Sequence, residues 1–267
     1  MKNILIICQA RYGSTRLPGK VLKKILDKPL LWYVIKRLEL VKTPNKIIIA
    51  TATSNENKPI IDFAKSLNIY NFAGSEEDVL DRYYQTAKKF NGDVLVRITS
   101  DCPLIDPAII DHALEIFLSR DYDYVSNGEE RKETYPDGFD IEIFSFKALK
   151  IAWKEAKWQS EREHVTPYIR KNNKFTKKYF ENDEDLSNFR LTVDTKEDFE
   201  LISIIIDKFY DRLEKFTMKE VIDFLRENPD LLKINEQYKR NEGYTKSLRE
   251  DKLINNEKIF LKNKKGT

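Results

Sequence analysis

The sequence predicts an α/β fold, a mostly parallel β-sheet with helices on both faces. Short apolar runs rich in β-branched residues alternate with longer stretches whose apolar residues recur at helical spacing. Such alternation indicates parallel βαβ units joined by right-handed crossovers. At 267 residues, the chain is long enough for one large domain of this kind.

In the first half of the chain, short apolar runs are the predicted strands and amphipathic stretches are the predicted helices. We expect strands at 3–8, 46–50, 69–72 and 94–98, and helices at 30–42, 58–67 and 76–90. Ser75 and Asp78 have the spacing of a capping box, which predicts that the third helix begins at Glu76.

The second half is less regular. We expect strands at 124–126, 140–144 and 190–193, and helices at 107–119, 146–156, 161–171, 196–210 and 218–227. Ser160 with Glu163, and Thr217 with Glu220, predict capping boxes for two of these helices. Beyond Glu242 the sequence is polar, and we expect it to be loosely ordered.

Composition and charge exclude several classes of protein. Hydrophobic residues make up 41% and charged residues 34%, and no apolar run is long enough for a membrane span. A net charge of +3 is small for a protein that binds a polyanion, so we expect no nucleic-acid partner. Cys8 and Cys102 lack partners at metal-ligand spacing, and we interpret them as buried thiols of a cytoplasmic protein.

The loop after the first strand has the composition of a phosphate-binding site. Residues 9–20, QARYGSTRLPGK, hold two glycines, two hydroxyls and three cations. Glycines let backbone N–H groups approach phosphate oxygens, and Arg offers paired donors. Open α/β sheets also bind ligands beyond the carboxyl ends of their strands. The loop matches neither Walker A nor GxGxxG, so a solvated surface loop is the alternative.

Two aspartates follow predicted strand ends and would face the same crevice. Asp101 lies just beyond strand 94–98, and Asp194 follows the run 190–193. Carboxylates on separate strand ends are a common way to hold a hard divalent cation, so the sequence predicts a Mg²⁺ site. The structural alternatives are that Asp194 caps the following helix and that Asp101 caps a turn.

A second group of acidic residues is predicted to bind a substrate. Asp140 and Glu142 share one face of a predicted strand, Asp137 precedes it, and Glu163 and His164 lie in the next helices. Such side chains suit the hydroxyls or the amine of a sugar. The alternatives are a solvated strand face beside an exposed helix start and, for His164, a packed or capping role.

Several collinear segments carry a resemblance to a known family. They are the loop 9–20, the Lys28-Pro29-Leu30 after it, GSEEDVLDRY (74–83), TSDCPLIDP (99–107), YPDGFDIEIFS (135–145), EREHVTPYI (161–169) and RLTVDTKEDF (190–199). Together they resemble the sugar-acid cytidylyltransferases, the CMP-Kdo and CMP-sialic acid synthetases. The branch most similar to this chain is that of spore coat polysaccharide biosynthesis protein F.

The resemblance implies a Rossmann-like, nucleotidyltransferase (GT-A-like) fold and a role for individual residues. Backbone near Gln9 and Ala10 would read the base, and Asp101 and Asp194 would carry the metal. The cations Arg11, Arg16 and Lys20 would act with Asp101 in catalysis. The full set that it implies for the nucleotide is Gln9, Ala10, Arg11, Gly13, Ser14, Arg16, Lys20, Arg82 and Ser100.

The predicted function is Mg²⁺-dependent nucleotidyl transfer for surface polysaccharide or glycan biosynthesis. An oxygen of a sugar or sugar acid would attack the α-phosphorus of CTP and release pyrophosphate. The base stays open because related enzymes use GTP. The sugar stays open because the resembling synthetases present basic residues to the carboxylate of their acceptor. Here the corresponding region is mostly acidic, and Arg162 and Arg170 are its only obvious cations, so an amino sugar or a less anionic acceptor is also expected.

The alternative function is a glycosyltransferase with a nucleotide-sugar donor, since such enzymes share the fold. They usually carry Asp-x-Asp after a strand. One such pattern in this sequence, Asp121-Tyr-Asp123, has no apolar strand before it. The pattern therefore argues against the alternative.

We predict one nucleotidyltransferase domain over 1–228, followed by a helix and polar tail over 229–267. Within the domain, 123–170 is predicted to be an insertion that binds the acceptor and forms a homodimer, as it does in the resembling synthetases. Its aromatic residues are typical of interfaces, the alternative being that they pack inside the monomer. They are Tyr135, Trp153, Trp158 and Tyr168.

Overall fold

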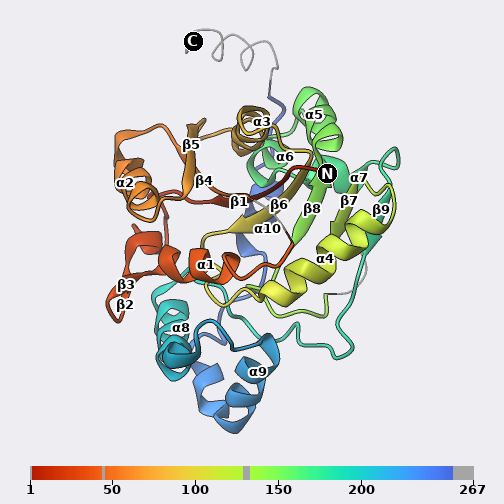
Figure 1. Cartoon of the computed structure of the whole chain (residues 1–267). Helices are drawn as coiled ribbons and strands as arrows, with labels where there is room; N and C mark the ends of the chain where they lie inside the picture. Colours follow the sequence, from red (N-terminus) through yellow and green to blue (C-terminus); the bar gives the residue numbers. More distant parts are fainter. Residues whose placement is uncertain (1, 44–45, 129–132, 255–267) are drawn as a thin grey trace.

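A seven-stranded sheet in the order β5-β4-β1-β6-β8-β7-β9 runs through the computed structural model, which describes residues 2–43, 46–128 and 133–254 (Figure 1). Four strands are parallel to one another: β1 (Ile4–Gln9), β4 (Lys46–Ala52), β5 (Tyr70–Gly74) and β6 (Val94–Thr99). β8 (Glu142–Ser145) runs antiparallel to β6 and β7 (Tyr124–Ser126), and β9 (Lys177–Tyr179) is parallel to β7. The mostly parallel α/β sheet is thus confirmed.

Helices cover both faces of the sheet because alternate strand residues point to opposite sides. On one face, Ile4 and Ile6 of β1 belong to an apolar cluster with five helices. These are α1 (Leu30–Leu38), α2 (Lys58–Ser66), α4 (Pro107–Ser119), α8 (Lys196–Phe209) and α9 (Met218–Glu227). On the other face, Leu5 and Ile7 pack with α3 (Val79–Lys89), α5 (Phe146–Glu155) and α7 (Pro167–Lys171).

Several short elements appear that the sequence did not predict. β2 (Lys24–Ile25) and β3 (Lys28–Pro29) form a small antiparallel pair, and β9 extends the main sheet. Short 3₁₀ helices lie at η1 (Lys20–Leu22), η2 (Asn55–Asn57), η3 (Tyr210–Arg212) and η4 (Pro229–Ile234). The first of them carries a site residue, Lys20.

Two predicted helix starts are wrong. α3 begins at Val79 rather than Glu76, because Asp78 caps it by accepting a hydrogen bond from the N–H of Asp81 (2.9 Å). The cap predicted at Ser160 and Glu163 is also wrong, since Glu161 accepts from the N–H of Trp158 (3.1 Å). The capping box of Thr217 and Glu220 at the start of α9 is confirmed.

The predicted helix 161–171 is divided into α6 (Gln159–His164) and α7. Val165, between them, has φ 71° and ψ −55°, and the N–H of Thr166 donates to the carbonyl of His164 (2.8 Å). This three-residue γ-turn is rare and strained for a β-branched side chain. Residues on both sides of this break, among them His164 and Thr166, line the cavity described below.

Further boundaries differ from the prediction. The helix predicted to reach residue 42 ends at Leu38, and β8 begins at Glu142. Residues 190–193 do not form a strand, since Arg190 makes a single bridge with Asp137 instead of joining the sheet. The segment after Glu242, expected to be loosely ordered, forms α10 (Glu242–Arg249). The rest of the predicted tail, 255–267, lies outside the described residues.

The predicted insertion 123–170 is built into the central sheet through β7 and β8. Most of its aromatic residues pack inside the monomer. Trp153 stacks on Tyr84 with ring centroids 4.1 Å apart, Tyr135 is buried, and Tyr168 packs edge-on to Phe175. Only Trp158, among the aromatics named for the interface, is exposed.

Candidate active site

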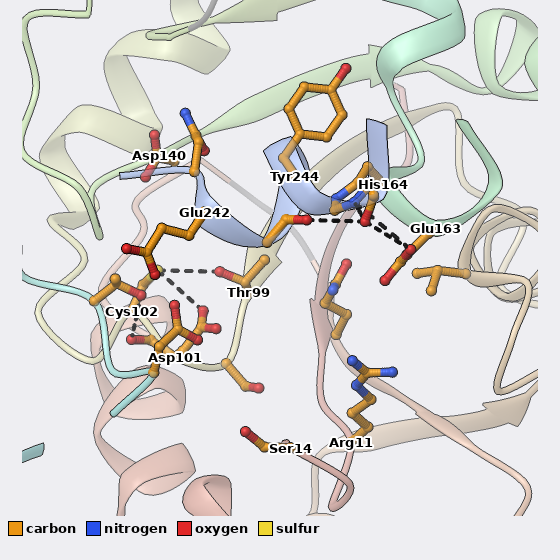
Figure 2. Close-up of a pocket in the computed structure, with 18 of the residues that line it drawn as sticks. Arg11, Ser14, Thr99, Asp101, Cys102, Asp140, Glu163, His164, Glu242 and Tyr244 are labelled. Atoms are coloured by element: carbon orange, nitrogen blue, oxygen red, sulfur yellow. Dashed lines mark hydrogen bonds and ion pairs between the residues drawn. The ribbon is translucent and has the colours of Figure 1, made fainter. Parts of the chain in front are cut away.

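A cavity of about 710 Å³ opens beyond the carboxyl ends of β1 and β6, which are neighbours in the sheet. Every residue that the sequence analysis assigned to the nucleotide, the metal or the acceptor lines this one cavity. Figure 2 shows Arg11 and Ser14 on one side of it and Asp140 and Tyr244 on the other. The position is where α/β sheets bind ligands, and the volume suits a small-molecule site.

The predicted phosphate loop leaves β1 and closes in a tight turn. Gly19 has φ 67°, and its N–H donates to the carbonyl of Tyr12 (3.0 Å). A Cβ at this position would meet the Tyr12 ring at 3.1 Å, so both the conformation and the space require glycine. The N–H of Tyr12 in turn donates to Oδ1 of Asn57 (2.8 Å). These bonds fix the loop that carries Arg11, Arg16 and Lys20.

Lys20 joins the two aspartates predicted to bind metal. Its Nζ lies 2.8 Å from Oδ2 of Asp101, 2.8 Å from Oδ1 of Asp194 and 2.7 Å from the carbonyl of Val193. Burial opposes both charges, but the ion pair dominates, so the pKa of Asp101 is lowered to about 2 and that of Lys20 is raised. The two aspartates therefore converge on one point.

Asp194 is held from its other side by two arginines. Arg16 Nη2 lies 3.0 Å and Arg190 Nη2 lies 3.3 Å from its Oδ2. Arg190 also donates to the fully buried Asp198, which accepts from the N–H of Asp194 (3.0 Å). Thr195, rather than Asp194, caps α8. The helix-cap alternative for Asp194 is therefore excluded.

Three cavity-lining side chains have a buried polar atom that lacks a partner among the described residues. One is Nε of Arg97, an arginine that already binds Glu142 through Nη1, and the other two atoms are Nε of Arg82 and Oε1 of Gln9. Arg82 is 1% exposed, and burial lowers its pKa to about 10. Its Nη1 donates to the carbonyl of Ser75 (2.8 Å). Buried polar atoms without partners are uncommon, so these side chains are suited to a polar ligand.

The acidic residues predicted for the acceptor line the cavity, but arginines already hold most of them. Asp137 accepts from Arg190 Nη1 (2.9 Å) and Asp140 from Arg240. Glu142 is buried and accepts from Arg97, Tyr124 and Thr166. The solvated-face alternative is therefore wrong for Glu142.

Burial and the neighbouring Asp140 raise the pKa of Asp137 to about 7, despite its contact with Arg190.

The two arginines named from the sequence for the acceptor region, Arg162 and Arg170, lie in different places in the structure. Arg162 is buried on Asp78 through Nη2 (2.6 Å), outside the cavity lining. Arg170 lines the cavity, with its guanidinium 5.4 Å from the ring centroid of Tyr244.

Glu163 and His164 meet the C-terminal helix at the cavity wall. Ser247 Oγ is 2.9 Å from Nε2 of His164 and donates to Glu163 (3.1 Å), while Tyr244 packs edge-on against the imidazole (Figure 2). Burial, with help from Arg97, lowers the pKa of His164 to about 4, so the ring is neutral near pH 7. His164 is thus a cavity residue that is also packed.

α10 is the part of the site that the sequence analysis missed. It contributes Glu242, Tyr244 and Ser247 to the cavity lining, and Glu242 Oε2 lies 3.0 Å from Nη1 of Arg16. No motif marks this helix, since its sequence, EGYTKSLR, is polar and lacks a capping side chain. The spacing of its few apolar residues is the available sequence signal for a helix here, and that signal is weak.

Other potentially reactive groups are ordinary. Cys8 and Cys102 are buried and unpaired, and burial raises the pKa of both thiols. His112 lies on α4, edge-on to Phe180 and outside the cavity lining. Within the described residues, no group of three or more Cys, His, Asp or Glu side chains could hold a metal. A metal here would use the two aspartates with substrate oxygens and water.

Comparisons with known proteins identify the family of this chain. The sequence model of a family described as cytidylyltransferase matches residues 5–248. The spore coat polysaccharide biosynthesis protein SpsF of Bacillus subtilis is 32% identical over 86% of this chain and 97% of that protein. A 3-deoxy-manno-octulosonate cytidylyltransferase of Geobacter metallireducens is 32% identical over 42% of this chain and 43% of its own length.

A solved structure of a cytidylyltransferase from Leptospira borgpetersenii superposes with a TM-score of 0.82 at 34% identity. It covers 87% of this chain and 97% of that one. Across the described parts of this chain, no helix combines the length and apolar character needed to span a bilayer.

Proposed function

Because this chain belongs to the cytidylyltransferase family, we propose that it transfers CMP from CTP to a sugar or sugar acid and releases pyrophosphate. The relatives named for 3-deoxy-manno-octulosonate and for spore coat polysaccharide support an acceptor of this kind and a role in polysaccharide synthesis. GTP remains the competing nucleotide. We place the reaction in the cytoplasm, where two unpaired cysteines are stable.

One observation carries the proposal. A single cavity holds a cationic loop, two converging carboxylates and three buried polar atoms, on Gln9, Arg82 and Arg97, that have no partners in the described chain. A nucleoside triphosphate has phosphates for the loop and polar groups for Gln9 and Arg82. Glycine backbone and arginine forks are the donors that such phosphates need.

The chain's own residues would act mainly by position and charge. An acceptor oxygen attacks the α-phosphorus in line, and pyrophosphate leaves on the opposite side. Arg11, Arg16 and Lys20 neutralise the charge that builds on the triphosphate and the leaving group. Asp137, Asp140, Glu142, Glu163 and His164 orient the acceptor. The reaction forms no covalent enzyme intermediate, which agrees with the high thiol pKa of both cysteines.

Mg²⁺ is proposed as the cofactor, with Asp101 and Asp194 as its protein ligands. The donor set fits, because both carboxylates approach one point and carboxylate oxygens suit a hard cation. Once bound, the ion would supply further charge neutralisation on the phosphate oxygens.

The glycosyltransferase alternative is weakened by its own motif. Asp121 and Asp123 do not line the described cavity, and neither do Asp183 and Asp185 of a second Asp-x-Asp in the sequence. Asp123 Oδ2 instead accepts from the N–H of Thr176 (3.0 Å). The Asp-x-Asp pattern therefore has a local structural role.

The test is a pyrophosphate-release assay that crosses CTP, GTP, ATP and UTP with a panel of sugar acids and sugar phosphates. Pyrophosphate that forms with CTP only when an acceptor is present supports the proposal. Turnover of a preformed nucleotide-sugar without pyrophosphate would instead support the glycosyltransferase. Release with GTP alone would keep the reaction class and correct the nucleotide.

We also propose that the enzyme acts as a homodimer. The support is now narrower than the sequence suggested, because Tyr135, Trp153 and Tyr168 pack within the monomer. Trp158 and Leu253, which form a bridge between their backbones, are 43% and 65% exposed. This apolar pair is the proposed centre of the interface.

A further inference from the structure

Lys20 uses all of its hydrogen-bonding capacity on protein oxygens. Its ammonium has three N–H donors, and three acceptors surround it: Oδ2 of Asp101 (2.8 Å), Oδ1 of Asp194 (2.8 Å) and the carbonyl of Val193 (2.7 Å). The side chain is 10% exposed. In this arrangement Lys20 has no donor left for a phosphate.

The ammonium lies where the proposed metal would bind. Mg²⁺ binds carboxylate oxygens at about 2.0–2.1 Å. An ion at that distance from the same two oxygens would share them with an Nζ that lies 2.8 Å from each. Two cations that share two carboxylate oxygens repel one another, because their charges lie only a few ångströms apart. Lys20 and the metal therefore compete for these carboxylates.

The remaining contacts of Asp194 are arranged so that Lys20 can leave alone. Arg16 and Arg190 contact Oδ2, whereas Lys20 contacts Oδ1. The aspartate would stay in place when the ammonium departs, with Oδ1 exposed toward Asp101. A lysine side chain is a flexible stem, and the Lys20 backbone is fixed by its N–H bond to the carbonyl of Leu17 (3.1 Å).

We propose that Lys20 is a built-in substitute for the divalent cation in the nucleotide-free enzyme. An incoming triphosphate draws the ammonium away from Asp101 and Asp194, and only then does the metal bind between them. Metal binding at this site would therefore depend on the nucleotide. This inference rests on the proposed function, because it assumes that the two aspartates are metal ligands.

The test measures Mn²⁺ binding by electron paramagnetic resonance without nucleotide, so that no triphosphate chelates the ion. Wild-type protein should bind Mn²⁺ weakly at this site, and Lys20→Met should bind it at least about tenfold more tightly, because the competing charge is gone. The double variant K20M/D101N should lose that gain. Lys23→Met, which removes an exposed lysine just after η1, three residues from Lys20, is the matched control and should behave as wild type.

Equal Mn²⁺ affinity of wild type and K20M, or no binding by K20M, would overturn the inference. If K20M does not fold in buffer because Asp101 and Asp194 repel one another, Mn²⁺ should restore the fold. Failure of Mn²⁺ to restore it would also contradict the inference. The pyrophosphate assay on wild-type enzyme is independent of this result. If wild-type enzyme releases pyrophosphate but K20M shows no gain in Mn²⁺ affinity, the proposed role of Lys20 is wrong and the proposed transferase activity stands.

Discussion

Asp194 shows how much one side chain of the site depends on its partners. Its two oxygens are divided between Lys20 on one side and Arg16 with Arg190 on the other. Its backbone N–H is bonded to the buried Asp198. A carboxylate held from so many directions keeps its position when the ligands change, which is what a preorganised site requires.

The first prediction at this scale concerns the two aspartates. Asp101→Asn or Asp194→Asn keeps the shape of the side chain but removes the charge needed for a metal and for Lys20. Turnover should fall by at least about a hundredfold, as when one preorganised electrostatic partner is lost. Steady-state pyrophosphate release measures it, and near-wild-type turnover of either variant would remove that residue from the site.

The second prediction separates the two cations of the loop. Arg16→Ala and Lys20→Ala should both raise KM for CTP or lower kcat. Their stabilities should differ, because the Arg16 side chain is 38% exposed, while Lys20 is buried between two carboxylates. Exposed pairs contribute about 0–1 kcal/mol, whereas breaking a buried pair costs roughly 3 kcal/mol or more.

Thermal unfolding in the absence of ligand checks this difference. Tm should fall by about 5–10 °C in Lys20→Ala and by a small amount in Arg16→Ala. Equal Tm values would mean that solvent compensates the exposed aspartates. Unchanged kinetics in both variants would mean that the loop does not bind the triphosphate.

The third prediction concerns pH and His164. Burial lowers the pKa of this imidazole to about 4, below its ordinary 6.5, so the unfolded chain takes up the proton more readily. The neutral ring therefore contributes stability that is present above pH 6.5 and is lost as the pH falls toward 4. Between these values wild type should lose roughly 2–3 kcal/mol more than His164→Gln. Denaturant unfolding from pH 7 to pH 4 measures the difference, and parallel curves would contradict it.

At the scale of elements, α10 links three parts of the site. Ser247 bonds to His164 of α6, Glu242 pairs with Arg16 of the phosphate loop, and Arg240, just before the helix, pairs with Asp140. Figure 2 shows the helix along the cavity, with Tyr244 beside His164. The helix therefore covers the site and also competes for one of its cations.

The fourth prediction follows from that competition. Glu242→Gln removes the carboxylate that holds Arg16, so CTP no longer has to displace it. Affinity for CTP should rise by about two- to tenfold, consistent with a partly exposed pair. Isothermal titration calorimetry at low salt measures it.

Glu250→Gln is the matched control. It removes the same charge just beyond the helix, and the described residues give no contact between Glu250 and Arg16. Equal gains in the two variants would reduce the effect to general electrostatics. Weaker binding in Glu242→Gln would show that the glutamate supports the nucleotide site instead.

At the scale of the whole molecule, the sheet provides the frame and its two apolar clusters hold the site edge in place. The phosphate loop and Asp101 follow adjacent parallel strands, and Asp194 precedes α8. Trp158 and Leu253 remain as an exposed apolar pair on the described surface. In the proposed homodimer this pair would lie at the centre of the interface.

The fifth prediction is that wild-type protein elutes at twice the 31.6 kDa monomer mass in gel filtration coupled to light scattering. Trp158→Glu should shift it to the monomer with little change in unfolding temperature, because the side chain is 43% exposed. A wild-type protein that is monomeric and fully active at nanomolar concentration would contradict the proposed homodimer.

The sequence by itself determined the alternating strands and helices, the phosphate loop and the placement of Asp101 at a strand end. These features are encoded locally: apolar periodicity specifies each element, and the chain order of loop and strand specifies where a side chain emerges. The place of the loop residues and of Asp101 in one cavity follows from that order. The family motifs added the roles of individual residues.

Only the tertiary structure decided which charges meet. The pairing of Lys20 with Asp194 joins residues far apart in the chain, and nothing in the spacing of either segment predicts it. The strained turn at Val165 and the docking of α10 likewise depend on contacts with distant segments. Local propensity is weak at such places, and long-range hydrogen bonds and ion pairs override it.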